Sequence, residues 1–383
     1  MVFASDSFRG RETGTPDERR AAAFLVGRLA RIGLDPAGDS GYLQRVPLVR
    51  MRLGAGTRFA VQARGVAAPG RLVTGLVPLI ALGDRASSPR PHVEGELVFA
   101  GYGVTRAGGG DDNPAARCAT AGSSLLPRRW PRDDHPQLLA GARFSAMIDV
   151  DRTPVESYNV IAALPGRDPD LQRSWVAFGA HYDHLGILPA VRGDSVAHGA
   201  DDDGSGSVAL LAIARAMRQA PRPRRSVLFV WHTGEEEGLL GSAYFASHPV
   251  VPLDSIVALI NVDMVGRNAP ESLYVVGLGV APHGTSRALG GVVDSVNASL
   301  AAPFAFDRAW DTPTNPQRIY SRGDAFPYAE RGVPIAFFTS GLHADYQQAS
   351  DEPSRIDYSK LAHVSQLLYQ VGEALANRDA RPR

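Results

Sequence analysis

The chain has 383 residues, of which 44% are hydrophobic and 21% are charged, so it is long enough for a substantial core and for two or three average domains. Forty basic residues balance forty acidic ones, which excludes the net positive field that binding to nucleic acid or to an anionic membrane surface requires. The single cysteine, Cys118, excludes an internal disulfide and a cysteine-based zinc ribbon, and we expect it to be inert.

The N-terminal segment predicts a helix and no targeting sequence. Thr15 and Glu18 form the pattern of a capping box, Pro16 occupies the favoured first helical position, and Gly33 follows a helical apolar repeat. The first twenty residues are rich in charge and contain no apolar run, so we predict no signal peptide in this sequence. The longest uncharged apolar stretch, 72–83, is about half the roughly 20 residues that span a bilayer.

Residues 51–155 differ from the rest of the chain in composition and in hydrophobic pattern. Short strand-like runs at 97–99 and 147–150 alternate with turns, and 107–140 is rich in glycine, proline, arginine and serine without a clear period. This pattern predicts a small β-rich domain with an irregular loop. The expected organisation is a helical part of the main domain at 1–50, the inserted domain at 51–155, and the rest of the main domain at 156–383.

After residue 156, apolar runs alternate with helical patterns. The predicted strands are 160–164, 176–180, 227–231, 256–262 and 334–338, and the predicted helices are 205–218, 239–247, 283–300 and 359–376. Nearly continuous apolar strands separated by helices indicate an α/β fold whose sheet is covered by helices on both faces. Ligands of such sheets bind beyond the carboxyl ends of the strands.

Polar side chains gather at those strand ends. They are His181 and Asp183; Asp201, Asp202 and Asp203; Glu235 and Glu236; Asp263; and His343, Asp345 and Tyr346. Imidazole and carboxylate are the ligand set of zinc, and a bridging carboxylate can hold two metals. Each group alone also has a structural explanation, because acidic residues cap helices and favour their first turn. Their conjunction at successive strand ends favours a metal site, and no GxSxG, HExxH, P-loop or GxGxxG motif competes with it.

Four segments resemble the bacterial co-catalytic di-zinc aminopeptidase family, which also contains glutamate carboxypeptidase-like enzymes and glutaminyl cyclases. They are GAHYDHLG (179–186), GADDDGSGS (199–207), GEEEGLLGSAYF (234–245) and INVDMVGR (260–267). The resemblance covers about 156–375 and implies the zinc-exopeptidase fold, a mixed, largely parallel sheet sandwiched by helices. Residues 8–25 are similar to the first helix of exported members, which implies a periplasmic or extracellular location. Residues 95–104 (GELVFAGYGV) resemble the start of a protease-associated domain, here shortened.

The resemblance also implies roles for individual residues. His181 and Asp263 would bind one zinc, Glu236 would bind a second, and Asp202 would bridge the two before a cis peptide bond. Glu235 would be the general base and acid, and Asp183 would orient the ring of His181. Tyr346 and His343 would contact the substrate. The substrate would be a peptide attacked by a water that the metals activate, with no nucleic acid or membrane as partner.

Two positions depart from the family pattern. Gln347 stands where the family has its last histidine ligand, and Gly323, Asp324 and Ala325 stand where it often has Ser-Asp-His. An amide oxygen is a poor zinc ligand beside imidazole. We therefore predict one tightly held zinc and a second that is weak or absent. The favoured function is a zinc aminopeptidase. The alternatives are a degenerate member that binds peptide or metal without turnover and a glutaminyl cyclase, which would need the half of the site that contains Gln347.

Overall fold

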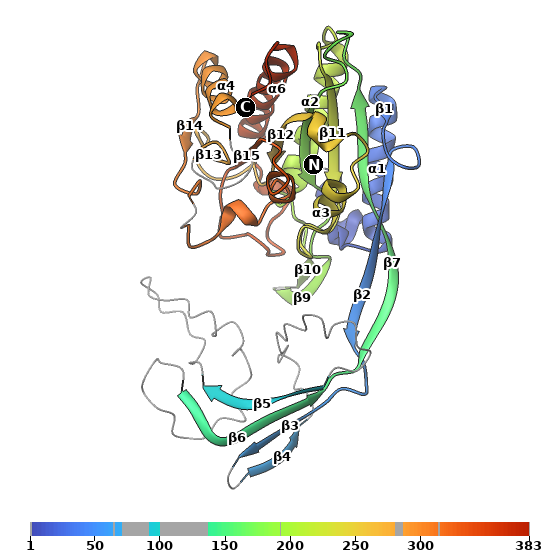
Figure 1. Cartoon of the computed structure of the whole chain (residues 1–383), viewed down its shortest axis with the longest axis vertical. Coiled ribbons are helices and arrows are strands. Elements are labelled where there is room, and N and C mark those ends of the chain that lie inside the picture. Colours follow the sequence, from blue (N-terminus) through green and yellow to red (C-terminus); the bar gives the residue numbers. More distant parts are fainter. Residues whose placement is uncertain are drawn as a thin grey trace. The chain divides into compact units, whose positions relative to one another are not determined.

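The structure is a computed structural model and describes residues 2–63, 66–70, 92–99, 137–191, 193–279, 286–312 and 315–382. It divides into two compact units (Figure 1). The larger unit comprises Met1–Leu48 and Val155–Arg383, and the smaller comprises Val49–Pro154. Within the described part of the chain, no helix is long and apolar enough to cross a membrane.

The larger unit is built on a nine-stranded sheet with the order β1-β7-β11-β8-β12-β15-β13-β14, in which β2 also pairs with β7. Its strands are β1 (Asp35–Pro36), β2 (Leu43–Leu53), β7 (Val150–Leu164), β8 (Trp175–His181), β11 (Ser226–His232), β12 (Ile256–Val262), β13 (Ser272–Val276), β14 (Ala305–Asp307) and β15 (Ile335–Thr339). A separate two-stranded sheet pairs β9 (Ile187–Val191) with β10 (Asp194–Val196).

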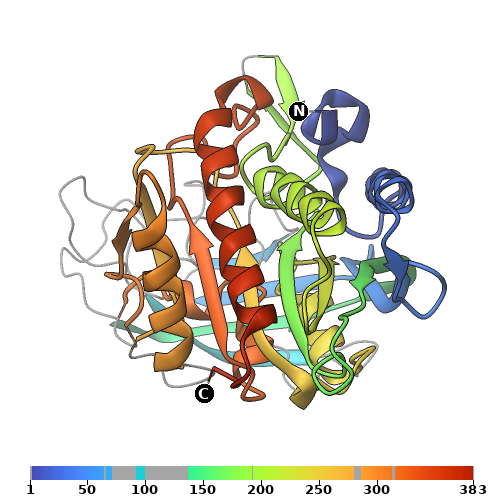
Figure 2. The same ribbon diagram turned by 90° about the horizontal axis from the view of Figure 1, so that it is seen from above.

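The helices of this unit divide between the two faces of the sheet. They are α1 (Pro16–Ile32), α2 (Gly204–Gln219), α3 (Leu240–Ser247), α4 (Arg287–Ser299), α5 (Phe326–Ala329) and α6 (Tyr358–Asn377). Short 3-10 helices are η1 (Val2–Ala4), η2 (Asp6–Arg11), η5 (Leu253–Ser255), η6 (Ile319–Ser321) and η7 (Pro353–Arg355). Figure 2 shows α6 between α2 and α4 on one face, where α1 also packs on α2. Residues of α3 and α5 belong to the core on the other face.

Two hydrophobic cores result from the alternation of side chains along the strands. In β11, Val227, Phe229 and Trp231 face the core beneath α1, α2, α4 and α6, whereas Leu228 and Val230 face the core beneath α3 and α5. Because successive strand residues point to opposite faces, a strand covered on both sides must be apolar throughout. Each fully buried side chain of this size contributes about 1.5–3 kcal/mol to folding.

The four central strands, β11, β8, β12 and β15, run parallel, while β7 and β13 pair antiparallel with the outer members of this group. The predicted mixed sheet between helical layers is therefore confirmed. Every strand predicted after residue 156 is present. The carboxyl ends of β8, β11 and β12 lie next to one another, and this edge carries the polar residues singled out from the sequence.

Two predicted element boundaries of the chain need correction here. The run 147–150 is not a strand, because Met147 ends β6 and Val150 begins β7; Asp149 between them bonds to the turn at 54–57. The helix predicted from 283 begins at Arg287, where the Ser286 side chain accepts from the backbone N–H of Leu289, and 283–285 lie outside the described residues.

Only half of the predicted capping box forms. Thr15 Oγ1 accepts from the backbone N–H of Glu18, and α1 ends at Gly33, whose φ is 80°. The Glu18 carboxylate does not return to Thr15. It accepts instead from the backbone N–H of Gly14 at 2.6 Å and from the Ser157 hydroxyl at 2.6 Å, and so becomes part of a buried network.

The smaller unit contains a four-stranded antiparallel sheet with the order β4-β3-β6-β5. Its strands are β3 (Arg58–Ala63), β4 (Val66–Gly70), β5 (His92–Phe99) and β6 (Gln137–Met147). The last four residues of the predicted irregular loop, 137–140, belong to β6, which corrects that boundary. Cys118, the apolar run 72–83 and residues 100–104 of the protease-associated resemblance lie outside the described residues. A protease-associated-like identity for this unit stays a prediction.

Candidate metal centre

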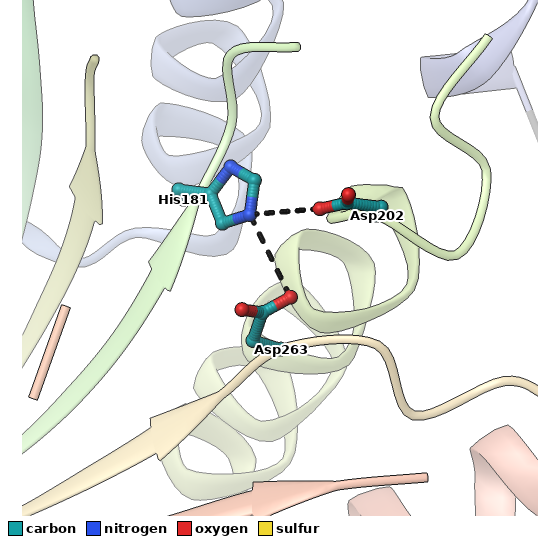
Figure 3. A group of neighbouring side chains, drawn as sticks. All are labelled: His181, Asp202 and Asp263. Carbon is teal, nitrogen blue, oxygen red and sulfur yellow. Dashed lines mark ion pairs between the residues drawn. The ribbon is translucent and has the colours of Figure 1, made fainter. Parts of the chain in front are cut away.

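The first candidate group joins the ends of β8 and β12 with the loop before α2. His181 is the last residue of β8, and its Nε2 lies 3.1 Å from Asp202 Oδ1 and 3.6 Å from Asp263 Oδ1 (Figure 3). His181 is 1% exposed and Asp202 is 4% exposed. Burial alone would lower the pKa of His181, but the surrounding carboxylates raise it well above its ordinary value. These three side chains are the ones that the sequence assigned to one zinc.

A second candidate group shares Asp202 and includes a residue that the sequence reasoning missed. His184, three residues beyond the end of β8, lies with Nδ1 2.5 Å from Glu236 Oε1 and 4.0 Å from Asp202 Oδ2. The two oxygens of Asp202 thus face two different histidines. Among the described residues, these two groups are the sets of His, Cys, Asp and Glu whose ligand atoms lie within 4.8 Å of one another.

The unpaired polar atoms of both groups fit a bound metal. His181 Nε2, both ring nitrogens of His184, Glu236 Oε1 and Asp263 Oδ1 are buried and make no hydrogen bond of ordinary geometry in the described structure, only the close ion-pair contacts given above. Tetrahedral zinc with bonds of about 2.0–2.2 Å places its ligand atoms roughly 3.3 Å apart, which is close to the separations around His181. His184 Nδ1 is closer than this to Glu236 Oε1, at 2.5 Å, and further from Asp202 Oδ2, at 4.0 Å. A small shift of the His184 ring would bring both distances to about 3.3 Å.

The loop before α2 is held by hydrogen bonds that leave the Asp202 carboxylate available. Asp351 Oδ2 accepts from the backbone N–H groups of Asp201 at 3.0 Å and Asp202 at 3.1 Å. Asp203 caps α2 by accepting from the N–H of Gly206 at 2.8 Å. The Asp202–Asp203 peptide bond is cis, as the family resemblance implied. Asp201 and Asp203 therefore have structural partners of their own.

Asp183 connects the histidine loop with the glutamate loop. Its carboxylate accepts from Thr13 Oγ1 at 3.0 Å and from the backbone N–H groups of Glu235 at 3.2 Å and Glu236 at 3.3 Å. The same carboxylate lies 3.7 Å from His181 Nδ1, while the Asp183 carbonyl is nearer, at 3.3 Å. The geometry thus gives Asp183 a wider structural role than the predicted orientation of His181.

A cavity of about 390 Å³ opens onto both groups. Asp202, Glu235, Glu236 and Asp263 lie on its wall. Two like charges 4 Å apart repel by about 4 kcal/mol near a protein surface, so this wall favours bound cations. Loss of hydration, together with the charges of Asp263, Asp324 and Glu236, raises the pKa of Glu235 well above its ordinary value. A carboxyl group in this position is a candidate to take up and return a proton.

The loop after β15 carries three predicted site residues, His343, Tyr346 and Gln347, and two of them line this cavity. Tyr346 and Gln347 line it, and Gln347 Nε2 donates to Glu236 Oε2 at 3.2 Å. His343 does not line it, contrary to expectation. The backbone N–H of Asp345 donates to His343 Nδ1, which turns Nε2 toward Asp201 Oδ2 at 3.2 Å.

Arg11 is a further supporting residue that the sequence reasoning missed. Its buried guanidinium donates to the carbonyl oxygens of Tyr182, His198 and Gly199 at 2.8–3.0 Å, and so holds the two loops that carry His181, His184 and Asp202. Burial lowers the pKa of Arg11 to about 10, although nearby aspartates oppose this. Arg11 gave no local signal in the sequence, because its partners are backbone oxygens 171–188 residues further along the chain.

Comparisons with known proteins show relatives in sequence and in fold. Leucine aminopeptidase 1 of Trichophyton rubrum is 29% identical over 247 residues, which cover 60% of this chain and 61% of that protein. The chain thus spans about three fifths of the length of the curated relatives it matches. In fold, it is similar to an aminopeptidase from Aneurinibacillus sp. strain AM-1 (TM-score 0.61, 16% identity, 100% of this chain and 93% of that one). It is also similar to a zinc aminopeptidase from Bacillus subtilis (TM-score 0.59, 18% identity, 100% and 95%). The model of Peptidase family M28 matches residues 159–372, more than half of the chain, and the chain belongs to that family.

Proposed function

We propose that this chain is a zinc-dependent aminopeptidase that removes N-terminal residues from peptides. The observation that carries the proposal is the position of Glu235 on the wall of a cavity shared with Asp202, Glu236 and Asp263, beside two buried imidazoles. The curated relatives are leucine aminopeptidases by name, which supports the same activity. The alternatives of a non-catalytic member and a glutaminyl cyclase have no observation in their favour.

Zinc bound at these groups would polarise the scissile carbonyl and lower the pKa of a water. His181, Asp263 and Asp202 are the proposed ligands at one position, and Asp202 with Glu236 at the other. Glu235, on the wall of the same cavity, takes the proton of the attacking water and returns it to the leaving amine. Asp183 fixes the backbone of Glu235 and Glu236 through the two hydrogen bonds to their N–H groups.

The remaining cavity wall supports a substrate with an apolar first residue. Ile319, Phe337 and Leu342 line it together with the carboxylates. A free α-ammonium group is favoured in this cavity because four carboxylates, Asp202, Glu235, Glu236 and Asp263, line its wall. Leucine, the residue in the names of the relatives, meets both conditions.

The number of zinc ions is a separate part of the proposal. The sequence predicts one tight zinc at His181 and a second that is weak or absent, because position 347 carries no imidazole. That premise overlooked His184, so the second position depends on whether its ring acts as a ligand. An exported location also stays a prediction from the resemblance.

The proposal is tested with leucine p-nitroanilide and its N-acetylated form at saturating zinc. We expect hydrolysis of the free-amine substrate and little of the acetylated one. Equal rates on both would contradict an aminopeptidase and indicate cleavage that ignores the N-terminus. Zinc binding without hydrolysis of any free-amine aminoacyl nitroanilide would favour a non-catalytic family member.

A further inference from the structure

We propose that His184 supplies the imidazole of the second zinc position, in place of the histidine that is missing at 347. The ligands at this position are then His184, Asp202 and Glu236, and Gln347 is a positioning residue for Glu236. The inference rests on the proposed zinc centre and changes its ligand set and stoichiometry. It replaces the expectation of one zinc with that of two per chain.

The ring of His184 already faces its proposed partners. Nδ1 lies 2.5 Å from Glu236 Oε1, and neither buried ring nitrogen makes a hydrogen bond of ordinary geometry in the described structure. Zinc ligands in one tetrahedral site lie roughly 3.3 Å apart, so the ring needs to withdraw from Glu236 by less than about 1 Å. The same movement leaves it within reach of Asp202 Oδ2, now 4.0 Å away.

Hydrogen bonds within the protein fix the backbone around His184. The N–H of His184 donates to the carbonyl of Arg11 at 3.2 Å, and the N–H of Gly186 donates to the carbonyl of Gly10 at 3.0 Å. Gly199 closes the other side of the ring. A Cβ at this position would lie 2.5 Å from two ring atoms, and its φ of +52° also favours glycine. A ligand held in this way loses little freedom on binding.

Gln347 has a contact that suits support better than coordination. Its Nε2 donates to Glu236 Oε2, the oxygen that does not face His184. A hydrogen bond to the outer oxygen of a ligating carboxylate orients the inner oxygen toward the metal, and loss of such a contact typically costs 10–100-fold in metal affinity. Gln347 thus stands where the family pattern has a metal ligand, but here it orients Glu236 and does not bind the metal.

The test is zinc per chain, measured by mass spectrometry after chelation, reloading and removal of free metal. We expect two zincs in the wild type, one in His184→Gln, and two again in the double variant His184→Gln/Gln347→His. Gln347→Ala should keep two but bind the second 10–100-fold more weakly. His198→Gln is the matched control: His198 is also buried beside carboxylates, Asp194 at 3.5 Å and Asp6 at 3.7 Å, and this variant should keep two.

One zinc in the wild type and two in Gln347→His would overturn the inference, because the missing imidazole would then be the one at 347. Two zincs in folded His184→Gln would also overturn it. Wild type, Gln347→His and Gln347→Ala all leave the buried ring intact, so their comparison can overturn the inference even if His184→Gln does not fold. Failure of this inference leaves zinc bound at His181 and free-amine substrates hydrolysed, whereas failure of the proposed function leaves no zinc or no hydrolysis of free-amine substrates.

Discussion

The two halves of the candidate metal centre share Asp202 but are assembled in different ways. In one half, His181 and Asp263 stand at the ends of neighbouring strands, β8 and β12, whose pairing sets their separation. In the other half, His184 and Glu236 stand on loops and are positioned by hydrogen bonds to Arg11, Asp183 and Gln347. A ligand at a strand end is fixed by the sheet itself, whereas a ligand on a loop depends on contacts from distant parts of the chain. The second half can therefore exchange the source of its imidazole without any change in the sheet.

The largest effect on activity is expected at Glu235, which belongs to neither group of metal ligands. Glu235→Gln should lower kcat by about 100- to 10,000-fold on leucine p-nitroanilide, because it removes the proposed proton carrier. Zinc content should stay unchanged. Glu237→Gln is the control, since Glu237 is exposed and does not line the cavity, and it should retain activity. A loss of zinc in Glu235→Gln would show that Glu235, and not Glu236, is the ligand of the second half.

The sequence predicted the first half of this centre better than the second, for physical reasons. Apolar runs such as 256–262 define buried strands, and the first polar residue after each run marks its carboxyl end, so His181 and Asp263 could be found by position alone. His184 stands three residues after His181 in the same segment, but nothing in the local sequence distinguishes a metal ligand from a structural histidine. Its role depends on Gly199 and on the backbone of the N-terminal segment, which approach only in the folded chain.

The same limit explains the errors in the fold. The five strands after residue 156 and the helices between them were predicted because their periodicity reflects burial. The break at Asp149 and the start of α4 at Ser286 depend on single side-chain contacts. Glu18 was predicted as a helix cap, yet its carboxylate enters a network with Ser157 and Thr233 that periodicity does not reveal.

A smaller effect is expected at Glu18, which is buried in α1 and should make the stability of the fold depend on pH. Burial, opposed by hydrogen bonds from Ser157 and Thr233, raises the pKa of Glu18 from 4.5 to about 7. A carboxyl group with a raised pKa binds its proton more tightly in the folded state, so it stabilises the fold below pH 4.5, and this contribution is lost as the pH rises toward 7. Relative to Glu18→Gln, the wild-type free energy of unfolding should fall by up to about 3 kcal/mol across this range.

Urea denaturation at pH 4.5 and at pH 7.5 measures this difference for the wild type and Glu18→Gln. Glu330→Gln, an exposed site at the end of α5, controls for the loss of one carboxylate. A constant difference between the wild type and Glu18→Gln at both pH values would mean that Glu18 is ionised in the folded state throughout, and that its hydrogen bonds outweigh its burial.

The most direct test of the account is anomalous X-ray scattering at the zinc edge from crystals of the zinc-loaded protein. The two-zinc proposal predicts two anomalous peaks, both next to Asp202. One should lie beside His181 and Asp263, and the other beside His184 and Glu236. A single peak at His181, or a second peak that contacts Gln347 and not His184, would contradict the claim that each half of the centre has an imidazole of its own.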